Sequence, residues 1–171
     1  ERESVCGWVR AWRARVWGMC GVVCVCVCVC VCVVLQCKLI TLAYAGNKLG
    51  GISLWNTQAA DGEELTKLTP GANAKFTMSI AASPDGRVVA GGDSSGVVQV
   101  WDPAVANGAP LQELSGHLKA TRSLAFSHDS NLLLAGSDDS YISLYDVRSW
   151  QPVAKISGHA SWVLGLDVAP S

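Results

Sequence analysis

The sequence predicts an all-β fold built from a repeated unit of four short strands, and three observations support this. An aromatic residue followed by Asn or Asp recurs at steps of 46 and 44 residues, at Trp55-Asn56, Trp101-Asp102 and Tyr145-Asp146. The pair Gly116-His117 returns 42 residues later as Gly158-His159. Between these positions short apolar runs alternate with turn formers, without helical periodicity, which favours strands throughout.

The length of the repeat indicates how the units are arranged. A period of about 40–45 residues with Gly-His near one end and Trp-Asp near the other is typical of a β-propeller blade. One blade cannot bury both faces of its small sheet and needs neighbours. Seven blades take roughly 280–310 residues, so 171 residues hold only about three blades, incompletely. We therefore expect a fragment of a seven-bladed propeller over residues 39–171.

Each expected blade consists of consecutive strands joined by turns. The first has strands at Leu39–Ala45, Gly51–Asn56 and Glu64–Leu68. The second has strands at Phe76–Ala82, Arg87–Gly92, Val97–Asp102 and Leu111–Ser115. The third has strands at Thr121–Ser127, Leu132–Gly136, Tyr141–Asp146 and Val153–Ser157, and a further strand starts near Trp162. The apolar runs 88–90 and 132–135 predict innermost strands covered on both faces.

A low-complexity segment precedes the repeats. All eight cysteines lie within residues 1–37, and Val and Cys alternate from Val23 to Val33. A strand with two apolar faces would aggregate, and thiols at every second residue do not have the spacing of a zinc site. The uncharged stretch 16–37, with Arg10, Arg13 and Arg15 before it, is long enough to span a bilayer.

We favour a fourth interpretation of the Val-Cys run, a translated dinucleotide repeat. The codons GTG and TGT encode Val and Cys, so a GT tract read in frame yields this polymer, and its low complexity has a genetic origin. On this basis residues 1–37 are expected to lie outside the fold. The repeat domain is assigned to 39–171, and attachment to a membrane is not expected.

Composition argues against several functions. The net charge is −1, so the repeats have no basic surface for nucleic acid. No nucleophile–base spacing, phosphate loop or metal-ligand set occurs outside the Val-Cys run. We therefore expect a protein that is not an enzyme, has no cofactor and no metal, and does not bind nucleic acid directly.

The repeats resemble the WD-repeat family. The pieces Gly116-His117, Leu124–Ser127, Gly136–Asp139 and Tyr141–Asp146 follow its pattern closely. In that family a His, an Asp, a Ser or Thr and a Trp of one blade form a buried hydrogen-bonded set. The resemblance places His117 and Asp139 in the first two positions. Tyr145 stands in the Trp position and Ala135 in the Ser/Thr position, so a structural His–Asp pair with an incomplete network is expected.

The resemblance also indicates a binding face and a weaker blade. Family propellers bind partners where the Gly-His loops and Asp turns emerge, which makes Arg122, Asp138 and Trp162 candidates for partner binding. Packing between blades is an alternative for Trp162, and a surface ion pair is an alternative for Arg122. The blade ending at Trp101 has no Gly-His, and Ser95 holds its Asp position, so it resembles a degenerate repeat.

A closer likeness is to the WD-repeat subunits of the superkiller complex, a group also found with the Paf1 transcription-elongation complex. It covers roughly residues 50–171, and the run Ser157–Leu164 is its more specific part. This implies a scaffold that docks a tetratricopeptide protein and a helicase in cytoplasmic mRNA decay, with a nuclear role through Paf1-complex subunits. A G-protein-β-like adaptor, a ubiquitin-ligase substrate receptor and a membrane-anchored propeller are the alternatives.

Overall fold

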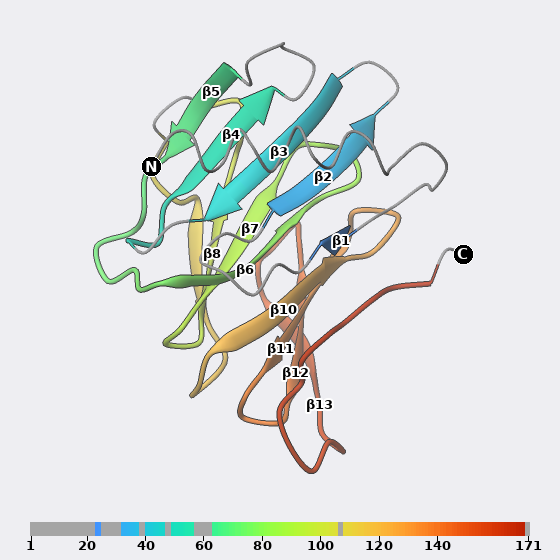
Figure 1. Ribbon diagram of the computed structural model, residues 1–171. Helices are drawn as coiled ribbons and strands as arrows, with labels where there is room; N and C mark the ends of the chain where they lie inside the picture. The colour runs from blue at the N-terminus through green and yellow to red at the C-terminus, as the bar shows by residue number, and fades with distance from the viewer. Residues whose placement is uncertain are drawn as a thin grey trace.

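The computed structural model describes residues 49–56, 63–105 and 108–169, and the strand segments 23–24, 32–37 and 40–46 nearer the N-terminus. These residues form three antiparallel sheets (Figure 1). The first sheet contains β1 (Val23–Cys24), β2 (Cys32–Cys37), β3 (Ile40–Gly46), β4 (Ile52–Asn56) and β5 (Glu63–Leu68). The second contains β6 (Thr77–Ala82), β7 (Val89–Asp93), β8 (Val97–Trp101) and β9 (Gln112–Ser115). The third contains β10 (Thr121–Phe126), β11 (Leu132–Ser137), β12 (Ile142–Asp146) and β13 (Pro152–Ile156).

The all-β prediction is confirmed, since the described residues contain strands and turns only. In every sheet the strands pair in chain order, as in a meander. The second and third sheets repeat the same register, because Val89 pairs with Trp101 in one and Leu133 pairs with Tyr145 in the other. The sequence repeat is therefore a structural repeat. In the second and third sheets its aromatic residue lies at or next to the end of the third strand.

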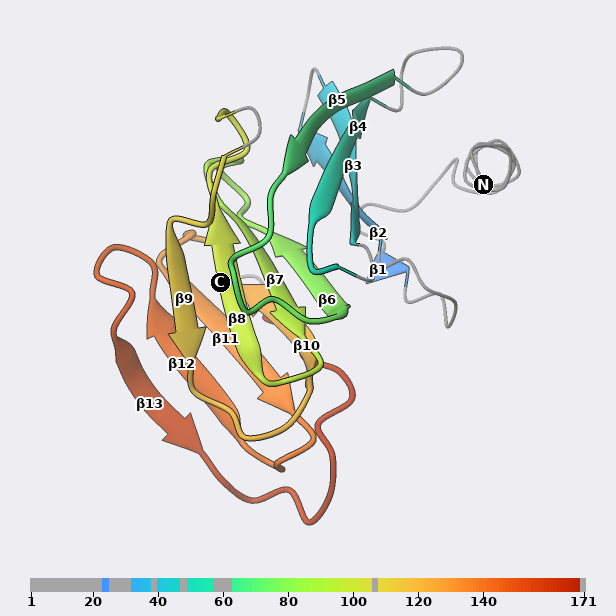
Figure 2. The same ribbon diagram turned by 90° about the vertical axis from the view of Figure 1, so that its left-hand side faces the viewer.

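The second sheet packs between the other two (Figure 2). Its alternate residues face opposite ways: Val89 and Trp101 join a cluster with Ile52 of the first sheet, while Ala90 and Val100 join one with residues of the third sheet. Period-2 alternation normally gives one apolar and one polar face. Here both faces of the second sheet are apolar because both are covered, as expected of a blade with two neighbours.

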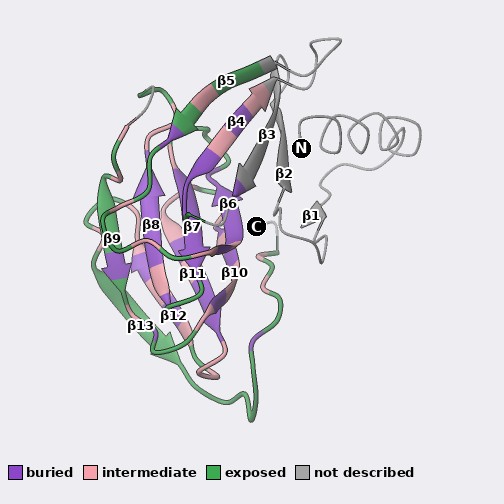
Figure 3. Cartoon of the chain, turned by 60° about the vertical axis from the view of Figure 1, so that its left-hand side comes forward, coloured by how far each residue is buried: buried purple, intermediate pink, exposed green. Residues whose placement is uncertain are grey.

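The prediction of which strands are innermost was wrong. β7 and β11, which hold the apolar runs, are each paired on both sides and are the second strands of their sheets. The sheets approach each other most closely at the edge strands β6 and β10, where the Ser79 hydroxyl donates to the Thr121 carbonyl at 3.1 Å. In β11, Leu132 and Leu134 are only partly buried, so the predicted covering of both faces is not met there. β7, however, is buried at every residue, which confirms the prediction for this strand (Figure 3). Its burial comes from the neighbouring sheets and from its two flanking strands.

Two other segments differ from expectation. The end of the low-complexity segment is strand β2, which pairs with β3 from Cys32 opposite Ala45 to Cys37 opposite Ile40. An extended backbone can complete a sheet whatever its genetic origin, because the ladder uses only backbone groups. Apart from β1 and β2, residues 1–37, including most of the stretch considered as a membrane span, lie outside the described residues. The domain boundary near residue 38 stays a prediction.

The strand expected near Trp162 does not form. Residues 162–169 run beside β10 and β11 without a strand partner, held by bonds from Val163 N to the Ser137 carbonyl (3.1 Å) and from Leu166 N to the Ser123 hydroxyl (2.9 Å). A strand requires a ladder with a second strand, and among the described residues this segment forms no ladder with β10 or β11. No helix among the described residues is long and apolar enough to cross a bilayer.

Candidate functional site

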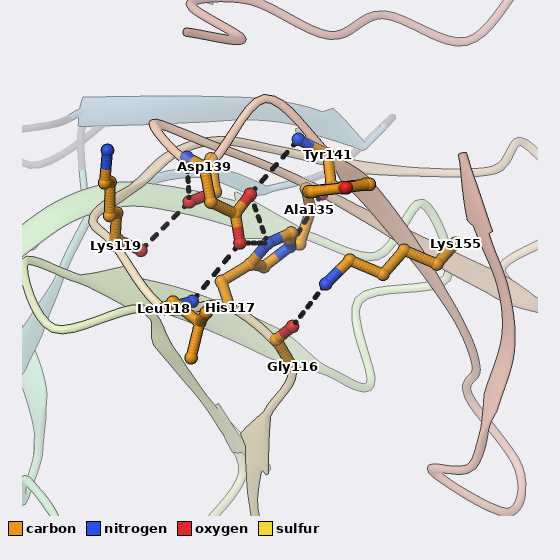
Figure 4. Close-up of polar contacts among 9 residues, drawn as sticks. Gly116, His117, Leu118, Lys119, Ala135, Asp139, Tyr141 and Lys155 are labelled. Carbon is orange, nitrogen blue, oxygen red and sulfur yellow. Dashed lines mark hydrogen bonds and ion pairs between the residues drawn. The ribbon is translucent and has the colours of Figure 1, made fainter. Parts of the chain in front are cut away.

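The loop between β9 and β10 and the turn between β11 and β12 meet at one end of the third sheet (Figure 4). His117 lies in the loop and Asp139 in the turn. The Nδ1 atom of His117 lies 3.1 Å from Oδ1 and 3.0 Å from Oδ2 of Asp139. The imidazole is fully covered, and the carboxylate is 8% exposed. The two residues expected to pair are therefore in contact and shielded from water.

The second nitrogen of His117 contacts the protein backbone. Nε2 lies 3.1 Å from the carbonyl oxygen of Ala135 on β11. A carbonyl oxygen only accepts hydrogen bonds, so Nε2 must carry a hydrogen for this contact to be one. Ala135 lacks the hydroxyl that the family resemblance places at this position, and only its backbone oxygen contacts the imidazole. The His–Asp pair therefore has the incomplete network that was expected.

Asp139 connects the loop to the turn. Its Oδ2 accepts a hydrogen bond from Leu118 N at 3.2 Å, and its Oδ1 accepts one from Tyr141 N at 3.1 Å. Burial acts to raise the pKa of Asp139, but the hydrogen bonds from His117, Leu118 and Tyr141 outweigh it and lower the pKa below the usual value. Asp139 is therefore ionised, and its carboxylate fixes the backbone of both the loop and the turn.

Tyr145 does not join this network. Its side chain is 3% exposed, and its hydroxyl has no hydrogen-bond partner among the described residues. The hydroxyl lies close to Gly116, at a place that a Cβ on that residue would occupy. The Ser143 hydroxyl interacts weakly with it and acts to lower the pKa of Tyr145, without meeting the geometry of a hydrogen bond. Burial raises the pKa of Tyr145. Its membership of a structural set with His117 and Asp139 stays a prediction.

The three residues predicted for partner binding lie together beside this loop. The Nε and Nη2 atoms of Arg122 donate to the two carboxylate oxygens of Asp138 at 2.9 and 3.0 Å, a bidentate pair. The hydrogen bond with Asp138 raises the pKa of Arg122. The guanidinium carbon lies 5.5 Å from the ring centre of Trp162, within cation–π range. Arg122 thus links the other two residues, because it is hydrogen-bonded to Asp138 and lies over the ring of Trp162. We call these three residues the stack.

Trp162 forms the outer end of this stack. The indole is 55% exposed, whereas the next residue, Val163, is 3% exposed and packs where a Cβ on Gly136 would clash. Val163 therefore anchors the segment, and Trp162 remains at the surface. Partner binding by Trp162, with packing between blades as the alternative, stays a prediction.

Further exposed side chains adjoin the stack. Leu118 is 91% exposed, although its backbone is bound to Asp139. Tyr141 is 40% exposed, with the Lys155 ammonium 4.5 Å from its ring centre. The sequence analysis did not identify Leu118, Tyr141 or Lys155 as site residues, because none of them belongs to a motif that indicates a binding role. Their proximity to Gly116-His117 and to Asp139 was the available signal. We call Leu118, Arg122, Asp138, Tyr141 and Trp162 the rim surface.

The second sheet holds its loops differently. Ser95 does occupy the position equivalent to Asp139, but the carboxylate comes from Asp93, two residues earlier. Asp93 Oδ1 accepts from the backbone of Ser95 (2.8 Å) and Val97 (3.0 Å), and Oδ2 accepts from Lys75 N (3.2 Å). The blade that resembles a degenerate repeat therefore retains a buried carboxylate at this turn. An alignment of the two repeats that allows a shift of two residues would have identified Asp93. Residues two apart in an extended chain point to the same side, so Asp93 can take the place of a carboxylate at Ser95.

The other two histidines lie apart from this site. His128, in the turn between β10 and β11, and His159, after β13, are both exposed. Among the described residues no three His, Cys, Asp or Glu side chains are placed to hold a metal ion.

Comparison with known proteins identifies the repeat. Residues 63–102 and 108–146 match the family model described as WD domain, G-beta repeat. The WD repeat-containing protein VIP3 of Arabidopsis thaliana is 33% identical over 141 residues, covering 75% of this chain and 43% of VIP3. The meiotic recombination protein rec14 of Schizosaccharomyces pombe is 39% identical over 79 residues, covering 46% of this chain and 26% of rec14. This chain thus spans less than half the length of either relative.

The fold agrees with this assignment. A solved structure titled "Structure of U3-55K" superimposes with a TM-score of 0.64 at 21% identity, covering 78% of this chain and 44% of the other. WD40 propellers generally bind other proteins. The matches over 63–102 and 108–146, together with the stacked antiparallel sheets, show that this part of the chain consists of WD40 repeats.

Proposed function

We propose that this chain is part of a non-catalytic scaffold and binds partner proteins through the rim surface. The observation that carries the proposal is the exposed Trp162 held rigidly by Arg122, which Asp138 in turn clamps with two hydrogen bonds. Trp, Tyr and Arg dominate the energetics of protein interfaces. An aromatic anchor that is already ordered loses little conformational entropy on binding.

The surroundings of Trp162 favour a protein partner. Leu118 and Tyr141, whose backbone N–H groups both bind Asp139, add exposed apolar area to the rim surface. The single cation of the stack, Arg122, is neutralised by Asp138. A polyanion such as nucleic acid is bound by uncompensated Lys and Arg, and this stack offers none. A partner with apolar or aromatic side chains fits it better.

More specifically, we propose that the scaffold is the propeller subunit of a superkiller complex, where it docks a tetratricopeptide protein and a helicase in cytoplasmic mRNA decay. A second association, with Paf1-complex subunits in the nucleus, belongs to the same proposal. The residues of the sequence resemblance, above all Ser157–Leu164, support it, because this run contains Trp162. The likeness to rec14, named for meiotic recombination, also favours a nuclear role.

Affinity purification of the tagged full chain, followed by mass spectrometry, tests both levels of the proposal. We expect tetratricopeptide and helicase subunits to copurify, and Trp162→Ala to reduce their recovery at least tenfold. Arg122→Lys should weaken binding less, because Lys keeps the charge but loses the bidentate bond that orients the stack. Leu111→Ala is the matched control, since Leu111 is 56% exposed but lies at the start of β9, at the other end of that strand from the loop.

The outcomes separate the two levels. Recovery that Trp162→Ala does not change would refute binding through the rim surface. Copurification with ubiquitin-ligase or G-protein components instead, still sensitive to Trp162→Ala, would keep the scaffold and reject the superkiller assignment.

A further inference from the structure

A cleft lies between the second and third sheets, and its lining includes neither Arg122, Asp138 nor Trp162. Its volume is about 400 Å³, within the range of sites that bind small ligands or peptide side chains. One wall is β9, around Glu113. The other is formed by β12 and β13 and by Trp150, in the turn between them.

The floor of the cleft contains an unsatisfied polar group. Tyr145 and Ser143 line it together with Gly116, against which the Tyr145 hydroxyl lies. That hydroxyl is buried and has no hydrogen-bond partner among the described residues. Leaving a buried hydroxyl unpaired is unfavourable, so an acceptor that enters the cleft and reaches it regains the lost hydrogen bond. A carbonyl oxygen is such an acceptor.

Trp150 adds a second unusual feature. It has a positive φ of 56°, a backbone conformation that bulky residues rarely adopt. A hydrogen bond from its own N–H to the Asp146 carbonyl at 2.7 Å holds this turn. The conformation directs the indole to the cleft, where it packs against the core cluster between the two sheets. Residues held in sparsely populated conformations are concentrated at ligand sites.

The walls indicate which kind of molecule fits. β9 and β13 are both edge strands, each paired on one side only, and an edge strand has free backbone groups that can pair with an extended chain. The lining includes one acidic and one basic side chain, Glu113 and Lys155. These are bonded to Gln99 and to the Gly116 carbonyl. The cleft thus has no net charge. It contains the indole of Trp150 and the Tyr145 hydroxyl, which can donate a hydrogen bond.

We propose that this cleft binds a short, extended, uncharged peptide segment of a partner protein. An apolar side chain of the peptide packs on Trp150, and a backbone carbonyl accepts a hydrogen bond from the Tyr145 hydroxyl. This gives the scaffold a second docking site, which adjoins the rim surface at Tyr141 but is distinct from the stack of Asp138, Arg122 and Trp162.

The test is selection from a phage library of random heptapeptides on the immobilised full chain, followed by affinity measurements with synthetic copies of the selected peptides. Ala154→Trp fills the cleft from an exposed position on β13 and removes no contact. Tyr145→Phe deletes only the hydroxyl. The control is Ile156→Trp, on the same strand at an exposed residue that does not line the cleft.

We expect a group of peptides whose Kd rises at least tenfold in Ala154→Trp and about tenfold in Tyr145→Phe, the equivalent of one lost hydrogen bond. Ile156→Trp and Trp162→Ala should leave their Kd unchanged. Recovery of no peptide, or of peptides that bind Ala154→Trp as tightly as the unchanged chain, overturns the inference. Peptides that lose affinity only in Trp162→Ala also overturn it, while supporting the rim surface.

Discussion

At the scale of the residue, one carboxylate has several hydrogen-bond donors. Asp139 receives bonds from His117, Leu118 and Tyr141, so it fixes a loop and a turn that are distant in sequence. The position of the Gly-His loop depends on this group. The rim surface, which borders the loop, depends on it indirectly.

The lowered pKa of Asp139 predicts a pH dependence of stability. Its pKa is lower in the folded than in the unfolded chain, so the stabilisation is complete above the unfolded value of 3.8 and is lost as the pH falls through the folded pKa. Asp139→Asn should lower the free energy of unfolding by about 1.5–3 kcal/mol at pH 7, the typical value of hydrogen bonds to charged groups. The difference from the unchanged chain should shrink below pH 4. Urea denaturation between pH 7 and pH 2 measures this.

Asp167→Asn serves as the control, because Asp167 is exposed. It should leave stability at pH 7 unchanged. A destabilisation by Asp139→Asn that stays the same at pH 2 would contradict the assigned role of the carboxylate.

Gly116 and Tyr145 should be energetically coupled. A Cβ at Gly116 would collide with the Tyr145 hydroxyl, so Gly116→Ala forces a shift in a buried aromatic residue. Overpacking of this kind costs about 1–3 kcal/mol. In a Tyr145→Phe background the collision is reduced, and the cost should fall by about 1 kcal/mol. A double-mutant cycle by thermal denaturation measures this coupling, and additive effects would refute it.

At the scale of the element, the hairpin turns differ in how well each residue suits its conformation. The turn between β7 and β8 has Gly96 at φ 95°, while the equivalent turn between β11 and β12 has Ser140 at φ 71°. Glycine adopts positive φ without steric cost, and serine does not. The second and third sheets thus provide a matched pair of turns within one chain.

Ser140→Gly should raise the free energy of unfolding by about 0.5–1 kcal/mol, since relief of the left-handed strain exceeds the entropy that glycine adds to the unfolded chain. The reverse change, Gly96→Ser, should be strongly destabilising. Its Cβ would lie 2.6 Å from the carbonyl oxygens of His117 and Lys119. Thermal denaturation of both variants checks the pair. An unchanged or lowered melting temperature for Ser140→Gly would show that no strain is present there.

At the scale of the whole molecule, stability comes from contacts between sheets. The second sheet has both faces covered, and its core residues form one cluster with each neighbour. The third sheet has one face against the second, while on the other side, of the residues that the structure describes, Val163 and Leu166 lie over Gly136. β13 is exposed along its whole length. Apolar side chains at the surface include Val153, Ile156 and Leu164.

Residues 39–171 on their own should therefore self-associate or require a partner. Repeat units that stack need a neighbour on each side or a polar terminal unit, and β13 presents an open edge. Analytical ultracentrifugation of this segment should show concentration-dependent association. A monomer that unfolds in a single cooperative transition would contradict the expectation.

The sequence by itself determined the all-β class, the repeat and the position of nearly every strand, because the pattern of apolar residues and turn formers is local. Through the family pattern it also predicted that His117 pairs with Asp139 and that Arg122, Asp138 and Trp162 lie near one another. Tertiary structure alone decided that Asp93 replaces the missing carboxylate, that the Ala135 carbonyl contacts the imidazole, and that β6 and β10 lie where the sheets approach. It also decided that the Tyr145 hydroxyl stays unpaired beside a cleft. Each of these depends on which groups from distant segments come within about 3 Å of one another, and a local pattern contains no such distances.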